Sequence, residues 1–255
     1  MEKTKSKADR KEAFARLSML LGIKVIHCSE KDTQITNKPK EVGEFVNTWS
    51  VEGLHEEGIA PAEMGWGSHE KWMPANAEVP NEGPRNQLFL KQCGMNTWVR
   101  SYVPGHQILG MVIRHGEALS ISEHLSVYDD KDPNKSIYRP TVHYAYMPCD
   151  QAISSLQEVR ANDHQLPHKI RILKDHEIIG GSDILGALVM GHEYKSWWTG
   201  SDLNINDARK LVAGQNSTVI QVGAGMIAAI LWMIQNPNEG KLYIYSRNCI
   251  LICIL

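Results

Sequence analysis

Three stretches of strand-forming residues follow one another closely in the middle of the chain, and they constrain the fold more than any other feature. They span residues 86–93 (NQLFLKQC), 97–103 (TWVRSYV) and 109–115 (LGMVIRH). Links this short suit hairpins, whereas a crossover between parallel strands takes about a dozen residues or more. The alternation of polar and apolar side chains in 97–103 also indicates a sheet with one solvated face.

Further strands and helices are predicted on both sides of these hairpins. The strand candidates are 23–29, 140–147, 168–174, 183–190 and 194–200, and the helix candidates are 8–21, 117–127, 149–162, 204–213 and 217–235. Residues 29–85 are irregular apart from a strand-like segment at 44–51. Hairpin-spaced strands followed by helices predict an α+β fold, with a mixed or antiparallel sheet and flanking helices, rather than a doubly wound parallel sheet.

The first predicted helix is amphipathic. Within 8–21, Ala13, Leu17 and Leu20 fall on one stripe at helical spacing, with Lys and Arg residues opposite. Gly22 follows directly and suits the end of a helix. No apolar core of the kind found in secretory signal peptides precedes this segment.

The charge balance and the cysteines limit the classes of function. The 255 residues carry 27 Lys+Arg and 29 Asp+Glu, a net charge of −2, which argues against a nucleic-acid binder that relies on a basic surplus. The five cysteines are scattered and form no CxxC pair, which argues against a disulfide framework and favours a reducing cytosol. The longest apolar stretch, 222–234, has about 13 residues, against about 20 for a membrane span. We therefore expect a cytoplasmic protein that binds neither nucleic acid nor a membrane.

Two short motifs suggest cofactors at first sight. GAGMIA (223–228) matches a GxGxxA dinucleotide fingerprint, but no acidic residue follows about 20 residues later at a strand end. We interpret these small residues as a close helix contact. His164 and His168 have the spacing of zinc ligands, but Pro167 between them disfavours the helix that would align them. We expect a solvent-exposed loop there and no metal site.

Five side chains are candidates for a functional cleft. Glu30 follows a buried strand, Trp49 lies in the irregular stretch, and Glu57 comes eight residues later. His115 ends a predicted strand, and Asp183 lies between a glycine pair and a buried strand. Carboxylates beside an aromatic face suit a cationic ligand, and a desolvated cation–π contact contributes about 1–2 kcal/mol. A histidine beside them could transfer protons near neutral pH. Each residue also has an ordinary interpretation as a surface charge or packing group, and spacing alone leaves open whether they meet.

Several longer runs resemble a known family. They are HCSEKDTQ, GEFVNTWSVEG, PAEMGWGSHE, IRHGEALSI, YRPTVHYAYMPCD and LVMGH. These runs closely resemble bacterial homospermidine synthases, which belong to the saccharopine-dehydrogenase-like enzymes. The likeness covers about residues 8–238 in order. It implies that the chain has the fold of the second domain of such an enzyme, the domain for substrate binding and dimerisation.

The resemblance implies a reaction in polyamine biosynthesis. Enzymes of this family use tightly bound NAD to oxidise putrescine to an imine with loss of ammonia. A second putrescine condenses with the aminobutyl fragment, and the same NADH reduces the Schiff base to homospermidine. The net reaction is an aminobutyl transfer, and NAD is the expected cofactor.

The resemblance also implies roles for the five candidate residues. Glu30 and Glu57 would bind ammonium groups, and Trp49 would shape the pocket and stabilise cationic intermediates. His115 would assist proton transfer, so that Trp49, Glu57 and His115 are the expected catalytic residues. Asp183 would line the cleft beside substrate and close to the nicotinamide.

The family begins with a Rossmann domain, and residues 1–30 contain no corresponding glycine-rich loop. We therefore expect a substrate and catalytic domain at 1–238, a divergent apolar tail at 239–255, and a Rossmann half that is encoded separately. A homodimer formed through the sheet is expected. Two alternatives stay open: a non-catalytic remnant or interaction module with the same fold, and a relative that couples an amino acid semialdehyde to an amine. The second would favour paired arginines in the pocket, whereas the matched motifs contain Glu and Trp.

Overall fold

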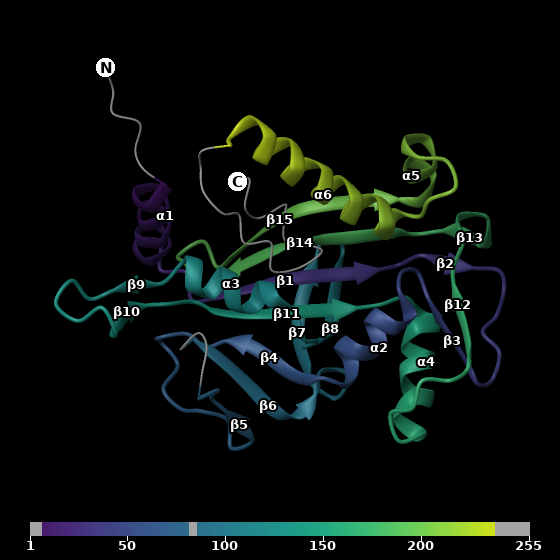
Figure 1. Cartoon of the computed structure of the whole chain (residues 1–255), viewed down its shortest axis with the longest axis horizontal. Coiled ribbons are helices and arrows are strands. Elements are labelled where there is room, and N and C mark those ends of the chain that lie inside the picture. The colour runs from purple at the N-terminus through teal and green to yellow at the C-terminus, as the bar shows by residue number, and fades with distance from the viewer. Residues whose placement is uncertain (1–6, 82–85, 238–255) are drawn as a thin grey trace.

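The computed structural model describes residues 7–81 and 86–237, and a nine-stranded sheet forms its centre (Figure 1). The strand order is β15 (Ser196–Asn204), β14 (Ser182–Met190), β1 (Val25–Asp32), β11 (Thr141–Met147), β4 (Pro61–Gly65), β6 (Gln87–Cys93) and β5 (Ala77–Glu78). The remaining two strands are β8 (His106–Met111), which pairs with β11, and β7 (Trp98–Val103), which pairs with β8. β1 and β11 are parallel, and the other pairs in this sheet are antiparallel. The predicted α+β fold with a mixed sheet is confirmed.

Six helices flank the sheet in the part of the chain that the structure describes. They are α1 (Lys7–Leu20), α2 (Val51–Ile59), α3 (Gly116–His124), α4 (Asp150–Ala161), α5 (Ile205–Leu211) and α6 (Ser217–Gln235). Short elements complete the fold: β2 (Ile35–Thr36), β3 (Glu44–Asn47), β9 (Val127–Tyr128), β10 (Ser136–Tyr138), β12 (Lys169–Ile172), β13 (Ile178–Gly180), η1 (Gly94–Asn96) and η2 (Asp175–Glu177). Figure 1 shows α6 along β14 and β15, and α2 and α4 near β3 and β12.

The irregular segment predicted at 29–85 contains one helix, α2, and three strands, β2, β4 and β5, that the sequence analysis missed. The strand expected at 44–51 stops at Asn47, and Ser50 begins α2 by accepting a hydrogen bond from the Gly53 backbone N–H at 3.0 Å. Val51 and Leu54 then face the core at helical spacing. Two glycines within nine residues reduce intrinsic helix propensity, so tertiary burial stabilises this helix.

The strand predicted at 109–115 is displaced toward the N-terminus. β8 ends at Met111, and the four residues 112–115 leave the sheet and lead into α3. The backbone N–H of Val112 donates to Thr97 O at 2.8 Å, which turns the chain over η1. His115 is therefore the residue before a helix rather than the last residue of a strand.

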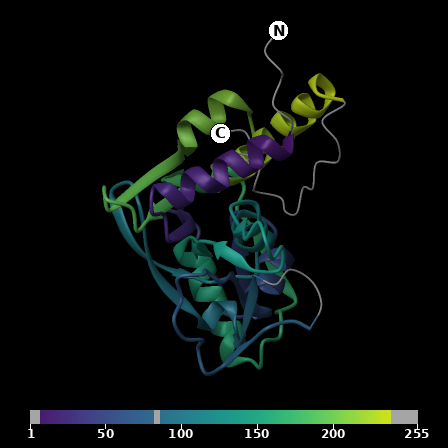
Figure 2. The same cartoon turned by 90° about the vertical axis from the view of Figure 1, so that its left-hand side faces the viewer.

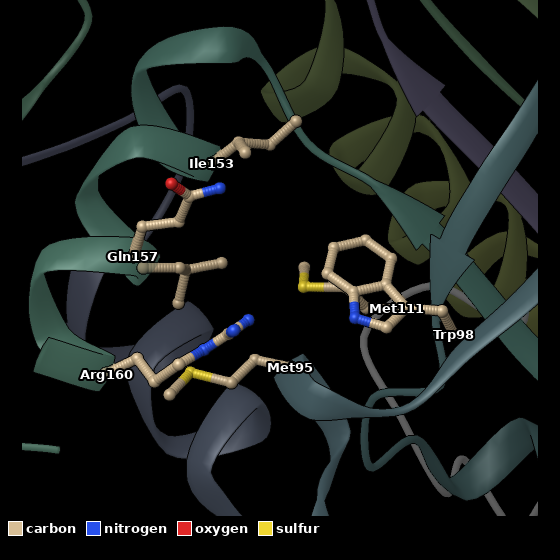
Figure 3. Close-up of a pocket in the computed structure, with 7 residues that line it drawn as sticks. Met95, Trp98, Met111, Ile153, Gln157 and Arg160 are labelled. Carbon is tan, nitrogen blue, oxygen red and sulfur yellow. The ribbon is translucent and has the colours of Figure 1, made fainter.

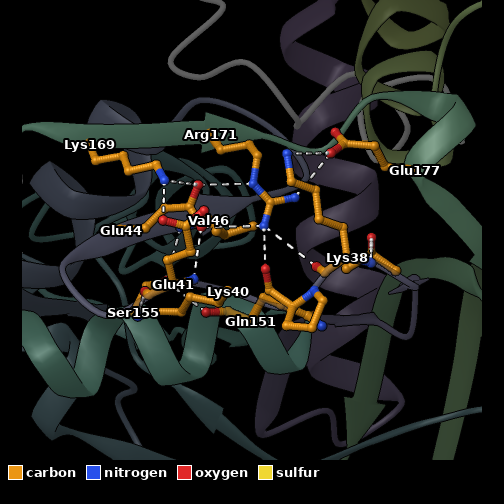
Figure 4. Close-up of polar contacts among 12 residues, drawn as sticks. Lys38, Lys40, Glu41, Glu44, Val46, Gln151, Ser155, Lys169, Arg171 and Glu177 are labelled. Atoms are coloured by element: carbon orange, nitrogen blue, oxygen red, sulfur yellow. Dashed lines mark hydrogen bonds and ion pairs between the residues drawn. The ribbon is translucent and has the colours of Figure 1, made fainter.

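An ionic network fixes the segment before α2 (Figure 4). β3 and β12 pair in parallel, and Arg171 donates from Nε to Glu44 Oε1 at 3.0 Å and pairs with Glu177 at 3.1 Å. Burial alone would raise the pKa of Glu44, but the Arg171 guanidinium lowers it below its usual value. Ser155 of α4 accepts from the Val46 N–H at 2.9 Å, so β3 is also tied to a helix. This network positions the chain that continues to Trp49.

Two helices, α1 and α6, lie at the outside of the molecule (Figure 2), and each has exposed apolar side chains. The predicted helix at the N-terminus is present as α1, but it buries Ala15 and Ser18, and the predicted stripe with Leu17 and Leu20 is exposed. α6 buries polar and small residues and exposes an apolar face made of Met226, Ile227, Ile230, Leu231 and Ile234. A contiguous exposed apolar face of this kind indicates a surface that binds a partner.

By length and composition α6 could also cross a membrane, which the count of 13 apolar residues had not indicated. It has 19 residues with a mean hydropathy of 1.8, and 28% of that stretch is buried. Its inner stripe is bonded to the rest of the fold, since Gln221 Nε2 donates to Asp183 O at 2.8 Å and Asn216 Nδ2 to Thr48 O at 2.6 Å. These bonds fix α6 as a helix that packs on the sheet.

Three cysteines, Cys28, Cys93 and Cys149, are free thiols. The predicted apolar tail at 239–255, with Cys249 and Cys253, lies outside the described residues.

Candidate functional site

Three buried carboxyl groups lie together at one end of the central strands. Glu30 and Asp32 alternate along β1 and so face the same side of the sheet, and Asp183 of β14 is the direct cross-strand partner of Asp32. Their exposed fractions are 4%, 3% and 1%. We call Glu30, Asp32 and Asp183 the acid cluster. Glu30 lies within β1 rather than after it, because the strand continues to Asp32.

The turn before β14 places Asp183 in this cluster. Gly181 has φ +99°, and a Cβ there would lie 2.1 Å from Thr33 O, so only glycine fits. This close approach brings the start of β14 against the end of β1. The glycine pair noted in the sequence therefore has a structural role beside the candidate carboxylate.

The three carboxyl groups differ in their hydrogen bonds. Asp32 accepts from Thr48 Oγ1 at 2.5 Å and from the Gln34 backbone N–H at 2.8 Å. Glu30 accepts from Tyr144 Oη at 2.5 Å. Neither carboxylate oxygen of Asp183 has a hydrogen bond of ordinary geometry with a described residue, although the Thr218 hydroxyl lowers its pKa. A buried carboxylate so poorly compensated is expensive and indicates a place for a ligand.

Burial shifts all three acids toward the neutral form. It raises the pKa of Glu30 to about 7, against the lowering effect of Tyr144, and the pKa of Asp32 to about 6, against the bond from Thr48. Burial and the neighbouring Glu30 and Asp32 raise the pKa of Asp183 well above its usual value. The cluster therefore retains protons near neutral pH, and a cation that entered it would displace them.

Two tyrosines of β11 connect the acid cluster to the other candidates. Tyr144 and Tyr146 alternate along β11 on the side that faces Glu30. Tyr146 Oη accepts a hydrogen bond from Trp49 Nε1 at 2.8 Å, which joins the indole to the cluster. Burial raises the pKa of both tyrosines well above 10.

His115 stacks on the ring of Tyr144. The two rings stack with centroids 4.0 Å apart and planes at 20°. His115 Nδ1 is 2.8 Å from Glu117 Oε2, and Nε2 is 3.4 Å from Glu57 Oε2. Burial alone would lower the pKa of His115, but these two carboxylates raise it to about 10. Glu57 and Glu117 therefore favour the protonated form of the imidazole at pH 7.

The structure brings all five sequence-predicted residues into one region. Glu30, His115 and Glu57 are joined through Tyr144, Trp49 through Tyr146, and Asp183 through the acid cluster. Sequence reasoning missed four residues of this region, namely Asp32, Glu117, Tyr144 and Tyr146. The alternation E-x-D in β1 and Y-x-Y in β11 was the available signal, because residues two apart in a strand share a face.

The opposite face of the same strands has a second polar group. His27 Nδ1 is 3.0 Å from Ser101 Oγ, and His27 Nε2 is 3.2 Å from His143 Nδ1. Ser29 Oγ is 2.9 Å from Ser101 Oγ and donates to Tyr102 O at 2.8 Å. We call His27, Ser29, Ser101 and His143 the histidine cluster. Burial lowers the pKa of His27 to about 3 and that of His143 to about 4.

The motifs interpreted as structural in the sequence occupy unremarkable positions. GAGMIA at 223–228 lies in the middle of α6, so its glycines form no phosphate-binding turn between a strand and a helix. His164 and His168 lie in the loop between α4 and β12. Among the residues that the structure describes, no group of three or more metal-binding side chains is present.

Two cavities lie outside the acid cluster or at its edge. A cavity of about 10 Å³ separates Trp98 from the face of α4 (Figure 3), and it is lined by Met95, Trp98, Met111, Ile153, Leu156, Gln157 and Arg160. A second cavity of about 200 Å³ borders Asp32 at the end of β1, with Lys31, Thr33, Gln34, Ile35, His106, Met147, Pro148 and Asp150. Asp32 of the acid cluster lines the second cavity, whereas the first is lined mainly by apolar side chains and by no carboxylate.

Sequence and structure comparisons identify relatives of this chain. Residues 1–248 match the saccharopine dehydrogenase C-terminal domain family. The homospermidine synthase of Blastochloris viridis is 43% identical over 231 residues, which are 90% of this chain and 48% of that protein. The homospermidine synthase of Mesorhizobium japonicum is 44% identical over 234 residues, or 90% of this chain and 47% of that one.

A solved structure gives the same result. The crystal structure of the homospermidine synthase of Legionella pneumophila in complex with NAD superposes with a TM-score of 0.87 at 41% identity. It covers 95% of this chain, and the match takes in 51% of the Legionella chain. The chain thus spans about half the length of the relatives that it matches.

Proposed function

The chain belongs to the saccharopine dehydrogenase C-terminal domain family, and from that premise we propose that it is the substrate-binding and catalytic half of a homospermidine synthase. The proposed reaction transfers an aminobutyl group from one putrescine to another, through oxidation, imine condensation and reduction with the same NAD. The catalytic domain is proposed to cover residues 1–238. The free thiols of Cys28, Cys93 and Cys149 suit the reducing cytoplasm that we propose as its location.

The acid cluster is the observation that carries this proposal. A diamine presents ammonium groups joined by a short apolar chain, and the cluster offers buried carboxyl groups beside the Trp49 indole. Asp183 lacks compensating hydrogen bonds among the described residues, and an ammonium group would donate hydrogen bonds to its carboxylate oxygens. Putrescine binding at neutral pH should therefore release protons from the cluster, because the bound cation lowers the pKa of Glu30 from about 7.

We assign the proton steps by the charge state of each side chain. Glu30 and Glu57 bind ammonium groups, and Glu30 can accept a proton from a reacting amine near neutral pH. Protonated His115 donates a proton to the nitrogen that leaves as ammonia. Trp49 stabilises cationic intermediates through its ring face, and its Nε1–H is fixed by Tyr146.

NAD fits the proposal as a cofactor that is bound mainly outside the described residues. When bound, it accepts hydride from the amine carbon and returns it to the Schiff base. The described part of the chain contains no glycine-rich turn between a strand and a helix that could bind its phosphates, since 223–228 is helical. Asp183 is the residue that we place closest to the nicotinamide.

We propose that the apolar face of α6 packs against the dinucleotide-binding half. The relatives are about twice as long as their match to this chain, so a second half of comparable size is available to cover it. The inner stripe of α6 contacts Asp183 through Gln221, so a domain placed on its outer face would lie one helix diameter, roughly 10 Å, from the acid cluster. A homodimer could form through β15, an edge strand that pairs only with β14 among the described strands.

A chimera tests the function directly. This chain replaces the matching 48% of the Blastochloris viridis enzyme, and the purified chimera is incubated with putrescine and NAD before chromatography of the product amines. We expect homospermidine from the chimera and little from this chain alone, which lacks a phosphate-binding turn in its described part. A folded chimera that binds NAD but forms no homospermidine would favour the non-catalytic alternative.

Two substitutions in the chimera test the assignment of residues. Trp49→Ala and Glu57→Gln should each lower the rate of homospermidine formation by about 10²-fold or more, since each removes an interaction with a developing cation. Trp98→Ala is the matched control, because this half-exposed indole borders the cavity of Figure 3, which none of the five candidate residues lines. Rates unchanged by the first two substitutions would remove both residues from the site.

A further inference from the structure

We propose that Tyr144 is a positioning residue that couples Glu30 to His115, an inference that rests on the proposed diamine site. Nothing in the sequence motifs assigns a role to this tyrosine. Its side chain touches both Glu30 of the acid cluster and the imidazole of His115 outside it. It acts through these two neighbours rather than on the diamine itself.

The geometry of Tyr144 supports this role. Its hydroxyl donates to Glu30 Oε2 at 2.5 Å, and its ring stacks on His115 at 4.0 Å. Only 1% of the residue is exposed, and β11 pairs with β1 over seven consecutive positions, so the ring has little freedom to move. The hydroxyl and the ring therefore fix the distance between the proposed proton acceptor and the proposed proton donor.

The Tyr144 hydroxyl affects the ionisation of Glu30. A hydrogen bond donated to a carboxylate stabilises its ionised form, and Tyr144 lowers the pKa of Glu30 against the effect of burial. The other groups that act on Glu30 come from several elements: His115 before α3, Glu57 of α2, Asp32 of β1 and Asp183 of β14. Without the hydroxyl, those acidic neighbours and burial would keep Glu30 protonated to higher pH. A protonated Glu30 neither attracts an ammonium group nor accepts its proton.

Tyr146 is a matched control on the same strand. It lies two residues further along β11, faces the same side, and is equally buried. Its hydroxyl accepts from Trp49 rather than donating to Glu30. Tyr144→Phe and Tyr146→Phe therefore remove the same atom from the same environment, but only the first removes a donor to Glu30.

The experiment is a carboxyl ¹³C NMR titration of the full chain with labelled glutamate. We expect the Glu30 midpoint to move to higher pH in Tyr144→Phe by up to about one unit, or tenfold in the protonation equilibrium, and to stay in place in Tyr146→Phe. Incorporation of 3-fluorotyrosine, whose hydroxyl is a stronger donor, should move the midpoint in the opposite direction in the wild-type chain. An unmoved midpoint in Tyr144→Phe, or equal shifts in both variants, would overturn the proposal.

A binding measurement separates positioning from a loss of structure. Putrescine is titrated into the chimera by calorimetry at pH 6.5 and at pH 8.5, where the diamine is still a dication. Tyr144→Phe should weaken binding about five- to tenfold at pH 6.5 and much less at pH 8.5, because Glu30 ionises at the higher pH without the hydroxyl. Equal weakening at both pH values would assign Tyr144 a purely structural role. Failure of wild-type protein to bind putrescine would count against the diamine site and leave the NMR result as the test of Tyr144.

Discussion

The two faces of β1 and β11 both bury ionisable side chains, acidic on one face and histidines on the other. On one face, residues such as Glu30 and Tyr144 belong to the acid cluster and its neighbours, and on the other, His27 and His143 form the histidine cluster. Burial raises the pKa of Glu30 to about 7 and lowers that of His27 to about 3, so desolvation favours the neutral form on both faces.

The two clusters differ in how many of their polar side-chain atoms have hydrogen-bond partners within the protein. In the histidine cluster, Ser101 and Ser29 close a chain with His27 and His143 and a backbone carbonyl. In the acid cluster, both oxygens of Asp183 lack ordinary hydrogen bonds with described residues. A self-satisfied polar cluster specifies the fold, whereas an unsatisfied one of like charges is suited to a ligand of opposite charge.

The largest expected contrast between the faces is in activity. In the chimera, Asp183→Asn should reduce homospermidine formation by about 10²- to 10³-fold, or about 3–4 kcal/mol, because a charge beside the reacting cation is lost. Ser101→Ala removes a hydroxyl from the histidine cluster and should change the rate less than about threefold. Steady-state rates at saturating putrescine measure both, and comparable losses in the two variants would erase the functional distinction between the faces.

The second contrast is in the dependence of stability on pH. The folded pKa of His27 lies near 3, below its unfolded value of 6.5, so the unfolded chain binds protons that the fold excludes. Stability from this histidine is present above pH 6.5 and decreases as the pH falls. Between pH 7 and pH 5, wild type should therefore lose about 2 kcal/mol more than His27→Gln. Urea unfolding at the two pH values measures this, and parallel losses would show that His27 is protonated in the fold.

The third contrast is in stability, where we expect Asp183→Asn, the variant that loses most activity, to be more stable than wild type. Asp183→Asn is expected to stabilise the fold by about 1–2 kcal/mol at pH 8, because it removes a poorly compensated buried acid. The folded pKa of Asp183 is raised, so its contribution to stability is present at low pH and decreases as the pH rises. The gain should accordingly be smaller at pH 4 than at pH 8 in thermal or urea unfolding. A destabilised variant at pH 8 would mean that Asp183 has partners that compensate its burial.

The smallest effect concerns a surface remote from both faces. Ile227→Lys on the apolar face of α6 should alter the free energy of unfolding by less than about 0.5 kcal/mol in this chain, because Ile227 is exposed. In the chimera the same change should lower NAD retention on gel filtration, since it places a charge against the other half. Leu211→Lys at the end of α5, equally exposed, is the control. Loss of NAD in both variants would mean that charge in general, rather than this face, is responsible.

The sequence predicted the elements better than it predicted the site. The limits of α6 at 217–235 and the strand at 140–147 could be derived because long apolar periodicity and β-branched alternation are local signals. α2 was missed because Gly53 and Gly58 weaken helix propensity, and its stability comes from burial of Val51 and Leu54. Burial against distant segments has no local signature.

The candidate residues were found through residue type and family resemblance, and their partners were not. Nothing near Glu30 in the sequence indicates that its hydrogen-bond donor is 114 residues away. The contacts of His115 were not predicted for the same reason, because Glu57 lies on another element and Glu117 alone gave no sign of a contact. Strand register decides these contacts, and register is a property of the whole sheet.

The long-range pairing of β1 has a consequence for the timing of folding. Its neighbours in the sheet are separated from it by more than 100 residues on both sides, as the Glu30–Tyr144 and Thr33–Ser182 bonds show, with separations of 114 and 149 residues. Closing such loops is slow; the acid cluster needs the closure of β1 with β14, and its contact with Tyr144 needs the closure with β11. A chain still emerging from the ribosome has no cluster until β14 has been synthesised and has paired. The diamine site that we propose would thus be completed last, and a diamine would stabilise only molecules that have finished folding.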